Sequence, residues 1–306
     1  MPELPDITVY ISALESRIRG TSLKSVKLQS AFLLRTYDIP FDRLINRRVT
    51  GLRRIGKRIA IGFEDDYWIV FHLMIAGRLH WRDSGGKPPG KSALIILTFD
   101  NGLLFLTEAG TRKKASLYLL HGGKSLALQN PGGVEIDTLD LKTFSHHFTR
   151  FNHTVKRVLT DPRIFSGIGN AYSDEILHRA RLSPVKQSQK LSPDEMARLF
   201  QATRDVLREW TEQLLKQTGT AFPEGVTAFH PEMAVHGKYN EPCPVCQTRI
   251  QRIRYADNET DYCPRCQTEG KLLADRALSR LLKKDWPKTI TELEENSLPG
   301  FRPDPR

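Results

Sequence analysis

The chain has 306 residues, and its 46 Lys and Arg against 35 Asp and Glu give a formal net charge of +11. This balance suits a polyanion such as nucleic acid, and an acidic membrane surface is the alternative target. No apolar run approaches the ~18 residues of a membrane-spanning helix, and the N-terminus lacks the apolar core of a signal peptide. We therefore expect a cytoplasmic protein of about two domains.

The N-terminus, Met1-Pro2-Glu3-Leu4-Pro5-Asp6, places a proline amine beside a carboxylate once the initiator methionine is removed. An N-terminal amine titrates near ~8, so a useful fraction is neutral and nucleophilic at pH 7. Attack of a proline amine on a sugar C1′ gives an iminium, whose positive charge acidifies the C2′ proton. The alternative is structural, because proline is common after methionine and Pro5 can begin a helix.

The first half of the chain reads as one helix followed by strands. Ile7, Ile11, Leu14 and Ile18 recur at helical spacing, and the helix is predicted to stop at Gly20. From there to about residue 120 the pattern is mostly β, with Asp100-Asn101-Gly102 as a hairpin turn. The predicted strands lie within Ser25–Gln29, Thr50–Phe63, Tyr67–Leu73 and Ala93–Leu106. This pattern indicates a β-sandwich or barrel with the first helix tethered to it.

The second half is predicted to be helical until the cysteines. Gly167-Ile168-Gly169-Asn170 forms a turn before a helix, where backbone N–H groups and the Asn170 side chain can hold a phosphate. A turn that only joins two packed helices is the alternative. Ser192-Pro193 with Glu195 has the signature of a helix start. The buried face of that helix is predicted to contain Met196, Leu199, Phe200, Val206, Leu207, Trp210 and Leu214.

All four cysteines lie in one C-x2-C-x16-C-x2-C pattern, formed by Cys243, Cys246, Cys263 and Cys266. Four thiolates at this spacing suit one tetrahedral zinc ion, and the intervening segment is long enough for a β-hairpin. The metal would be structural, because four sulfur ligands leave no position for water. Two disulfides or a redox pair are the alternative. Between the pairs, Arg249, Arg252 and Arg254 place three cations on a short ribbon that can rest on a phosphate backbone.

Taken together, these motifs resemble the formamidopyrimidine-DNA glycosylase / endonuclease VIII family. The resemblance rests on Pro2-Glu3-Leu4-Pro5, on Gly167-Ile168-Gly169-Asn170 with Tyr172 and Asp174-Glu175, and on the cysteine pattern. It covers roughly residues 2–267. Lys57 and His72 also fall where that family keeps a lysine and a histidine.

The resemblance implies an α+β multidomain fold. Its parts would be an N-terminal catalytic β-sandwich with a leading helix at 1–125, a helix-two-turn-helix domain at 135–237, a four-cysteine zinc-finger hairpin at 238–270 and a helical extension and tail at 271–306. The implied activity is that of a bifunctional DNA glycosylase and abasic-site lyase with one structural Zn²⁺. Its partner would be double-stranded DNA with a damaged base or abasic site, bound by a monomer, in a bacterium at the nucleoid.

The resemblance also assigns roles to single residues. Pro2 would attack C1′ while Glu3 protonates the deoxyribose ring oxygen, and elimination would then nick the strand. Lys57, His72 and Asn170 would hold phosphates around the lesion, with Lys57 close to the chemistry. For Lys57 the alternative is general attraction to the DNA backbone. For His72 it is a satisfied histidine of the core.

The sequence departs from the family in the loops that would fill the space of an everted base. After His72 the chain reads Leu73-Met74-Ile75, so Met74 or Ile75 is the candidate apolar wedge. The second loop, Glu108–Ala115, is basic through Arg112 and its neighbours but lacks the aromatic residue that the formamidopyrimidine branch inserts. We therefore expect recognition of the opposite base to differ.

Two further departures concern charged positions. The family's hairpin arginine is replaced by Asn258 among three acidic residues, so Arg252 or Arg254 would have to bind the phosphate. Asp6 stands where the family usually has glutamate, which shortens the active-site carboxylate by about one methylene. We expect catalysis to survive both changes.

Two segments complete the prediction. Residues 217–229 have the composition of a mobile loop at the family's lesion-covering position. After Cys266, a helix is predicted from the spacing of Leu273, Ala277, Leu278, Leu281 and Leu282, ahead of a Pro-rich tail. The alternatives to a bifunctional glycosylase are a noncatalytic or lyase-only protein that binds damaged DNA on the same scaffold, and a zinc-ribbon module that binds RNA or protein.

Overall fold

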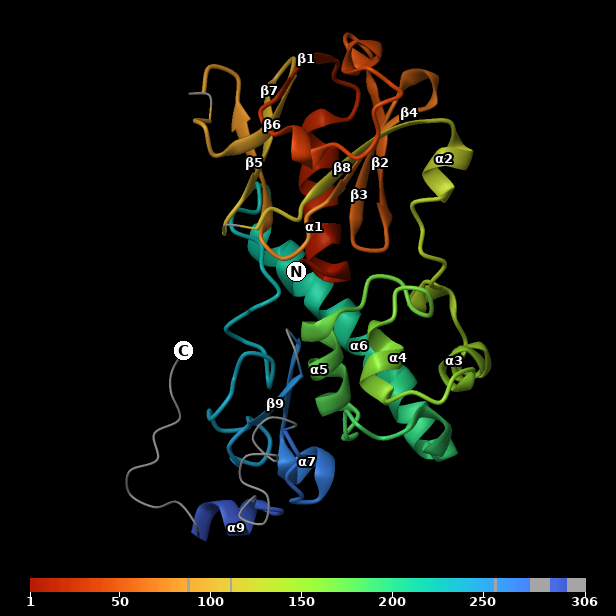
Figure 1. The fold of residues 1–306 in the computed structure, drawn as a ribbon, viewed down its shortest axis with the longest axis vertical. Coiled ribbons are helices and arrows are strands. Elements are labelled where there is room, and N and C mark those ends of the chain that lie inside the picture. Colours follow the sequence, from red (N-terminus) through yellow and green to blue (C-terminus); the bar gives the residue numbers. More distant parts are fainter. Residues whose placement is uncertain (87–88, 111, 256–257, 276–286, 296–306) are drawn as a thin grey trace. The chain divides into compact units, whose positions relative to one another are not determined.

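The computed structural model describes residues 1–86, 89–110, 112–255, 258–275 and 287–295 (Figure 1). The chain divides into two compact units that alternate along the sequence. Unit 1 contains residues 1–138, 161–168 and 207–228, and unit 2 contains residues 139–160, 169–206 and 229–306. Within the described ranges, no helix combines the length and apolar character needed to cross a membrane.

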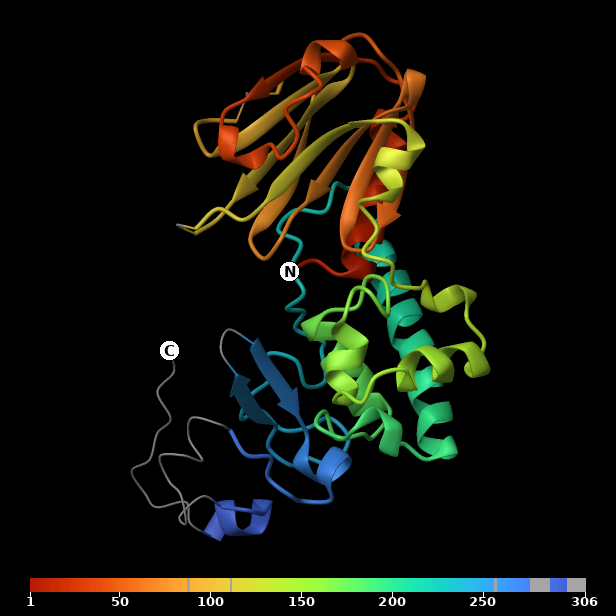
Figure 2. The same ribbon diagram turned by 45° about the vertical axis from the view of Figure 1, so that its right-hand side comes forward.

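Unit 1 is built on two four-stranded antiparallel sheets, ordered β1-β6-β7-β5 and β2-β3-β4-β8 (Figure 2). The strands are β1 (Leu23–Leu28), β2 (Val49–Ile55), β3 (Arg58–Phe63), β4 (Tyr67–His72), β5 (Gly77–Asp83), β6 (Ala93–Phe99), β7 (Gly102–Glu108) and β8 (Ser116–His121). The predicted β-sandwich is therefore confirmed. The stretch predicted at 50–63 is a hairpin that turns at Gly56, where φ is +59°.

The leading helix α1 (Leu4–Ile18) packs into the core of the sandwich. Ile7, Tyr10, Leu14 and Ile18 are fully buried, and they share one apolar cluster with residues from both sheets. Because this face follows the 3.6-residue helical period, the sequence fixes which side of α1 faces the strands. The first turn of α1 is thereby anchored to a rigid support.

Unit 1 also contains the short helix α2 (Gly123–Ala127) and the second part of α6 (Pro193–Thr218), a helix that begins in unit 2. The predicted start of α6 is confirmed. Ser192 Oγ accepts a hydrogen bond from Glu195 N at 3.2 Å, and Glu195 Oε2 accepts one from Ser192 N at 2.8 Å. This reciprocal pair satisfies two backbone donors at the helix end.

Unit 2 combines helices with a two-stranded hairpin. Its elements are α3 (Leu141–Thr149), α4 (Val155–Thr160), α5 (Asn170–Arg179), the start of α6, β9 (Gln251–Tyr255), β10 (Asn258–Tyr262), α7 (Pro264–Thr268) and α9 (Ile290–Glu295). The predicted helical domain and the cysteine-flanked hairpin are thus confirmed. Of the predicted C-terminal helix, Ala277, Leu278, Leu281 and Leu282 lie outside the described residues.

Candidate active site

The start of α1 is closed by two carboxylates that bond to each other's backbone. Glu3 is the N-cap residue, and its N–H donates to Asp6 Oδ2 at 2.8 Å, while the Glu3 carboxylate accepts from the Asp6 backbone. Glu3 is 2 % and Asp6 0 % exposed, and Pro2 is buried beside them. The shorter Asp6 thus reaches the cap without a further methylene, and it holds Glu3 in a fixed orientation.

Lys57 belongs to the same electrostatic environment. It lies in the turn between β2 and β3, where burial lowers its pKa, while the carboxylates of Glu3 and Asp6 act in the opposite direction. Burial likewise lowers the pKa of the N-terminal amine, with Glu3 and Asp6 again opposing. The N-terminus, two carboxylates and Lys57 therefore act on one another within unit 1.

Arg78 is a charged group near this site that the sequence analysis did not single out. It is the second residue of β5, directly after Gly77, and its Nη1 donates to the carbonyls of Ile75 at 3.0 Å and Gly77 at 2.7 Å. Its positive charge adds to the lowering of the pKa of the N-terminal amine. Nothing in the local pattern marks it, because its relevance depends on β5 folding back toward the start of α1.

His72 ends β4 and pairs in register with Arg58 of β3. Burial, with Arg58 and Lys57 adding to the effect, lowers the pKa of His72 to about 4. The imidazole is therefore neutral at pH 7, and it can donate one hydrogen bond without bringing a charge.

The turn after His72 presents Ile75 to solvent. Leu73 is 1 % exposed and anchors the turn, whereas Ile75 is 59 % exposed. Gly77 donates to Leu73 O at 2.9 Å, and a Cβ on Gly77 would lie 2.3 Å from that oxygen, so only glycine fits. Met74 is half-buried with φ at +54°. Of the two predicted wedge candidates, Ile75 is the more available.

The second loop is organised by Glu108 at the end of β7. Its Oε1 accepts from the backbone of Lys114 at 2.8 Å and of Ala115 at 3.1 Å, and the side chain is 6 % exposed. Arg112 is exposed, whereas Thr111 lies outside the described residues. The buried carboxylate therefore shapes a loop whose described tip is cationic.

The predicted Gly-x-Gly turn packs against the start of α1. Gly167 O accepts from Leu4 N at 2.9 Å, and a Cβ on Gly167 would lie 2.8 Å from Leu4 Cβ. Its φ of +81° also favours glycine. Within unit 1, this turn therefore helps to fix the helix that carries Glu3.

Asn170 begins α5 in unit 2 and is half-buried. Its carbonyl accepts from Lys156 Nζ at 3.4 Å and from Ser173 Oγ at 2.9 Å. As the N-terminus of a helix, this end of α5 has backbone N–H groups and the positive end of the helix dipole, both of which favour an anion.

Asp174 and Glu175 of the same motif are buried structural residues. Asp174 pairs with Lys156 and lies 2.9 Å from His236 Nδ1. Glu175 accepts from the backbone of residues 234, 235 and 236 at 2.8 to 3.0 Å, and burial raises its pKa. These contacts tie α5 to the segment that leads into the cysteines.

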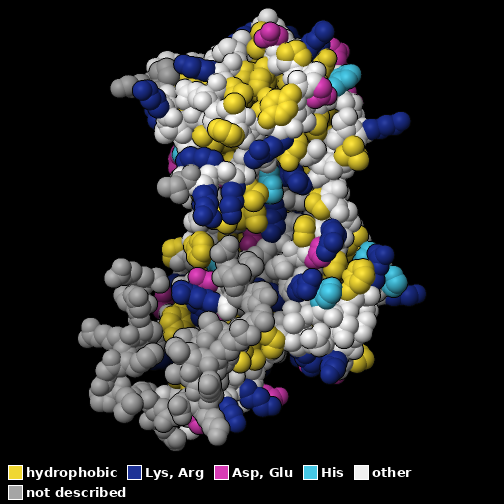
Figure 3. Space-filling model, in the orientation of Figure 1, with side chains coloured by type: hydrophobic (Ala, Val, Ile, Leu, Met, Phe, Trp, Pro, Cys, Tyr) yellow, Lys and Arg dark blue, Asp and Glu magenta, His cyan; other side chains and the backbone are white. Residues whose placement is uncertain are grey.

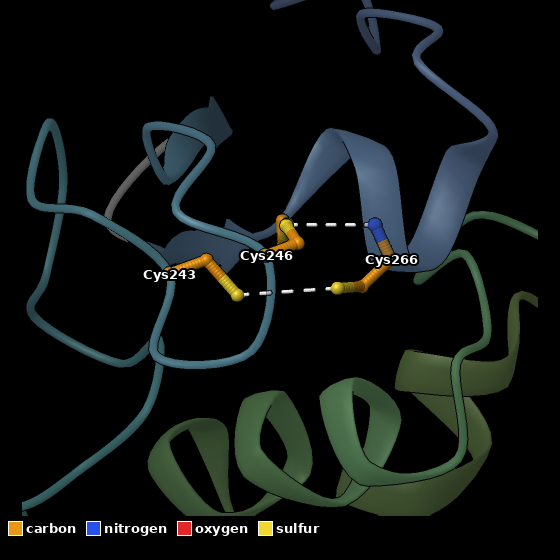
Figure 4. Close-up of side chains that lie close together, drawn as sticks. Cys243, Cys246 and Cys266 are labelled. Atoms are coloured by element: carbon orange, nitrogen blue, oxygen red, sulfur yellow. Dashed lines mark hydrogen bonds between the residues drawn. The ribbon is translucent and has the colours of Figure 1, made fainter.

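The four cysteines converge, and Figure 4 shows Cys243 facing Cys266. The Sγ atoms of Cys243 and Cys266 are 3.9 Å apart, and those of Cys246 and Cys263 are 3.3 Å apart. Four Zn–S bonds in a tetrahedron require sulfur separations of about 3.8 Å, so the donor set fits one zinc ion. His178 Nε2 lies 3.3 Å from Cys243 Sγ, as an outer-shell donor would. The cysteine pattern thus forms a structural zinc site.

The hairpin arginines differ in their surroundings. Arg252 Nε lies 2.8 Å from Asp261 Oδ1 and 2.9 Å from Glu259 Oε2, and its side chain is 19 % exposed. The Arg254 side chain is 55 % exposed, and its Nη2 lies 3.7 Å from Glu259 Oε1, which is a looser pair than those of Arg252. Asp261 is buried and compensated, so it does not face a ligand as a bare charge. Arg254 is the better placed of the two to meet a phosphate.

Residues 219–228 of the predicted lesion-covering loop pack within unit 1. Thr220 O accepts from Arg17 Nη2 at 2.7 Å, the rings of Phe222 and Tyr10 are 5.9 Å apart, and Glu224 Oε2 lies 2.6 Å from His80 Nδ1. An aromatic contact and side-chain hydrogen bonds therefore attach this segment to α1 and β5.

Comparison with known proteins agrees with this architecture. The chain matches the profiles of the formamidopyrimidine-DNA glycosylase N-terminal domain over residues 1–116, the glycosylase H2TH domain over 133–221 and the zinc finger found in FPG and IleRS over 240–268. The fold and sites thus define a zinc-finger, helix-two-turn-helix protein of DNA repair.

Individual relatives narrow this class. The chain is 30% identical over 288 residues to the formamidopyrimidine-DNA glycosylase of Heliobacterium modesticaldum, covering 87% of this chain and 100% of the relative. It is 43% identical over 155 residues to an uncharacterized formamidopyrimidine-DNA glycosylase-like protein of Mycobacterium tuberculosis, covering 50% of this chain and 96% of that one. The chain therefore belongs to the formamidopyrimidine-DNA glycosylase family.

The fold has a solved counterpart in the Lactococcus lactis Fpg complex with abasic-site DNA. The TM-score is 0.76 at 24% identity, over 87% of this chain and 99% of the Lactococcus chain. Dark-blue Lys and Arg side chains are spread over the face shown in Figure 3, consistent with the net charge of +11.

Proposed function

We propose that the protein is a bifunctional DNA glycosylase and abasic-site lyase that removes oxidised bases from double-stranded DNA as a monomer. The observation that carries the proposal is the buried Pro2-Glu3 start of α1, with Asp6 and Lys57 in its electrostatic environment. In this proposal residues 1–125 carry the chemistry, 135–237 and 238–270 bind DNA, and 271–306 form an extension. Family membership supports the glycosylase activity.

The nucleophile would be the Pro2 amine exposed by removal of Met1. Burial lowers the pKa of the N-terminal amine that now occupies this environment, and we expect the same burial to favour a neutral Pro2 amine. Its nitrogen bonds to C1′ as the glycosidic bond breaks, and the base leaves with the bonding electron pair and takes up the proton that the Pro2 nitrogen loses. Glu3 gives a proton to the ring oxygen as the C1′–O bond breaks, which leaves a Schiff base.

The Schiff base then undergoes elimination. Its positive nitrogen accepts electrons when the C2′ proton is removed, and the 3′ phosphate leaves with its bonding pair. Water finally hydrolyses the imine and frees Pro2. Lys57 would contact the phosphate next to the reacting sugar; burial lowers the pKa of Lys57, and the carboxylates of Glu3 and Asp6 act against that lowering.

The remaining site residues would hold the DNA. Neutral His72 would donate one hydrogen bond to a phosphate, and Asn170 would bind another at the start of α5. Arg254, with Arg252 two residues before it on β9, would contact the DNA backbone. Met74 or the more exposed Ile75 would enter the stack, and Arg112 would meet the opposite strand.

Borohydride trapping on duplex DNA with an abasic site tests the chemistry. The methionine-processed protein should form a covalent adduct at residue 2. A matched variant with two residues added before Pro2 should bind the duplex but form none. Pro2→Gly keeps an amine but loses the ring, so it should trap more weakly.

The outcomes separate the candidate functions. DNA binding without any adduct would favour a noncatalytic protein, to which the second loop without an aromatic residue also points. An adduct on abasic DNA without release of any oxidised base would favour a lyase alone.

A further inference from the structure

Beyond the zinc finger, the chain folds back on itself. The finger profile ends at residue 268, and Glu269 and Gly270 then turn the chain with φ of +54° and +84°. Residues 270–272 pair with 288–290: Leu272 N donates to Lys288 O at 2.8 Å, and Ile290 N donates to Gly270 O at 2.9 Å. Ile290 is 8 % exposed. The chain therefore has an ordered layer outside the matched domain.

This layer is attached to both strands of the zinc hairpin. Leu273 N donates to the hydroxyl oxygen of Tyr262 in β10 at 2.8 Å, and Tyr262 is 1 % exposed. Arg254 N in β9 donates to Asp275 Oδ2 at 2.6 Å, and Asp275 is 3 % exposed. A short bond from a backbone N–H to a buried carboxylate is among the stronger neutral-to-charged contacts. It fixes the backbone at Arg254 from the outer edge of the hairpin.

Arg254 differs from the other two hairpin arginines. Arg249 Nη1 donates to the Asn240 carbonyl at 3.1 Å and side chain at 3.2 Å, and Arg252 is paired with a buried aspartate. Arg254 has a fixed backbone and a half-exposed side chain, whose Nη2 lies 3.7 Å from Glu259 Oε1. A cation with a fixed backbone and a half-exposed side chain is suited to phosphate binding, because less entropy is lost on contact.

We propose that Asp275 is a positioning residue for DNA binding, which holds Arg254 where it meets a backbone phosphate. The extension thereby takes part in the grip on DNA and offsets the missing charge at Asn258. The inference rests on the proposed function, in which Arg254 contacts DNA. The inference opposes simple electrostatics: losing the acceptor for Arg254 N must weaken DNA binding, whereas the loss of a negative charge alone is expected to strengthen it.

The salt dependence of DNA binding is the readout. Each phosphate contact contributes about 0.9 to the slope of log K against log[salt]. The full-length protein and its variants are titrated with a duplex that carries a tetrahydrofuran abasic analogue, at several salt concentrations. Arg254→Gln should lower the slope by about 0.9. Asp275→Ala should lower it by a similar amount and weaken binding at low salt about threefold to tenfold.

Three further variants sharpen the result. Asp275→Asn removes the charge but keeps an acceptor for Arg254 N, so it should bind nearly as the wild type. The double variant Arg254→Gln/Asp275→Ala should lose no more than Arg254→Gln alone, because both changes remove one contact. Glu241→Ala removes a half-exposed carboxylate that pairs with Lys238 in the same finger, and should not lower the slope.

An unchanged or steeper slope in Asp275→Ala would overturn the inference, as would additive losses in the double variant. Loss of zinc or of thermal stability in Asp275→Ala, with Asp275→Asn equally affected, would reduce Asp275 to a structural role. Borohydride trapping is scored separately at saturating DNA. An adduct at residue 2 with an unchanged slope would reject the positioning role alone, whereas a missing adduct with the expected slopes would reject the chemistry alone.

Discussion

The start of α1 and the zinc hairpin solve the same problem, the placement of charged groups, in opposite ways. At α1 the carboxylates of Glu3 and Asp6 are three residues apart and bond to each other's backbone. In the hairpin, the Asp261 carboxylate accepts from Arg252 Nε, nine residues away, and from Gly237 N. The Asp261 backbone N–H donates to Asp174 Oδ2 of α5. One site is preorganised by a single helix turn, and the other by four chain segments.

This difference has consequences for robustness. The capping box joins Glu3 and Asp6 through the local backbone, so a substitution at either residue acts directly on the α1 site. The hairpin depends on many contacts of moderate strength and on the zinc ion. Substitutions at α1 should therefore remove chemistry and spare binding, whereas changes in the finger should do the reverse.

Glu3→Gln is the sharpest test at α1. The amide is nearly isosteric and can still accept from the Asp6 backbone, but it has no proton to give. Because this proton opens the sugar ring, we expect Schiff-base formation and strand cleavage to slow by about 10²–10⁴-fold, the usual contribution of general acid catalysis. Single-turnover kinetics on a duplex with an oxidised base measures this, with affinity for an abasic analogue unchanged.

Glu15→Gln is the matched control on the same helix. Its Oε1 accepts from Leu52 N at 2.8 Å, a bond that glutamine keeps. It should leave the rate unchanged. A Glu3→Gln rate within threefold of the wild type would contradict the role of Glu3.

Removing zinc tests the other region. Chelation, or Cys263→Ser, should unfold the finger, because metal binding supplies its folding free energy. Loss of the hairpin contacts should weaken DNA binding roughly tenfold to a hundredfold, since a hydrogen bond to a charged group is worth ~1.5–3 kcal/mol. Binding should return when Zn²⁺ is restored. Zinc-free protein that binds DNA normally would show that the grip lies elsewhere.

The sequence predicted features that depend on spacing within one segment. The four-cysteine pattern, the start of α6 and the apolar face of α1 are all confirmed, because cap chemistry, helical period and ligand spacing are local. The strands β5 and β8 were not named. β5 carries alternating polar residues, and β8 is held by pairing with β4 and by bonds to residues 34–36.

Contacts between distant segments were beyond the sequence. The spacing of Arg249, Arg252 and Arg254 suggested three equivalent cations, but burial of Asp261 makes Arg252 a partner of the protein. The fit of Gly167 against Leu4 and the bond between Arg254 and Asp275 likewise join positions far apart in the chain. Single-sequence patterns contain no signal for such pairs.

His72, at the end of β4, makes the stability of the fold sensitive to acid. The pKa of His72 is about 4 in the fold because of burial and of Arg58 and Lys57, against 6.5 in the unfolded chain. The unfolded chain therefore binds the proton first, and stability is lost as pH falls from about 6.5 toward 4. By pH 5 the loss should be about 2 kcal/mol.

Urea unfolding of the wild type and of His72→Gln at pH 7 and pH 5 measures this loss. The free energy of unfolding should fall less in the variant than in the wild type between pH 7 and pH 5. The control His146→Gln, at an exposed position, should show the same fall as the wild type. An equal fall in His72→Gln and the wild type would place the acid sensitivity in another group.

The smallest expected effect concerns the candidate wedge in the turn between β4 and β5, which would have to enter the stack of DNA bases. Ile75 is 59 % exposed, and Met74 is half-buried in the same turn. Ile75→Ala should slow release of an oxidised base roughly tenfold, because it removes apolar surface worth ~1–2 kcal/mol when buried between bases. It should slow cleavage of an abasic site much less, since no base has to be everted there.

Met74→Ala is the matched control, with a similar truncation one residue away, and should act on both substrates nearly as the wild type. The reverse ranking would return the wedge to Met74, and equal loss on both substrates would mean that the turn positions the sugar instead of opening the stack.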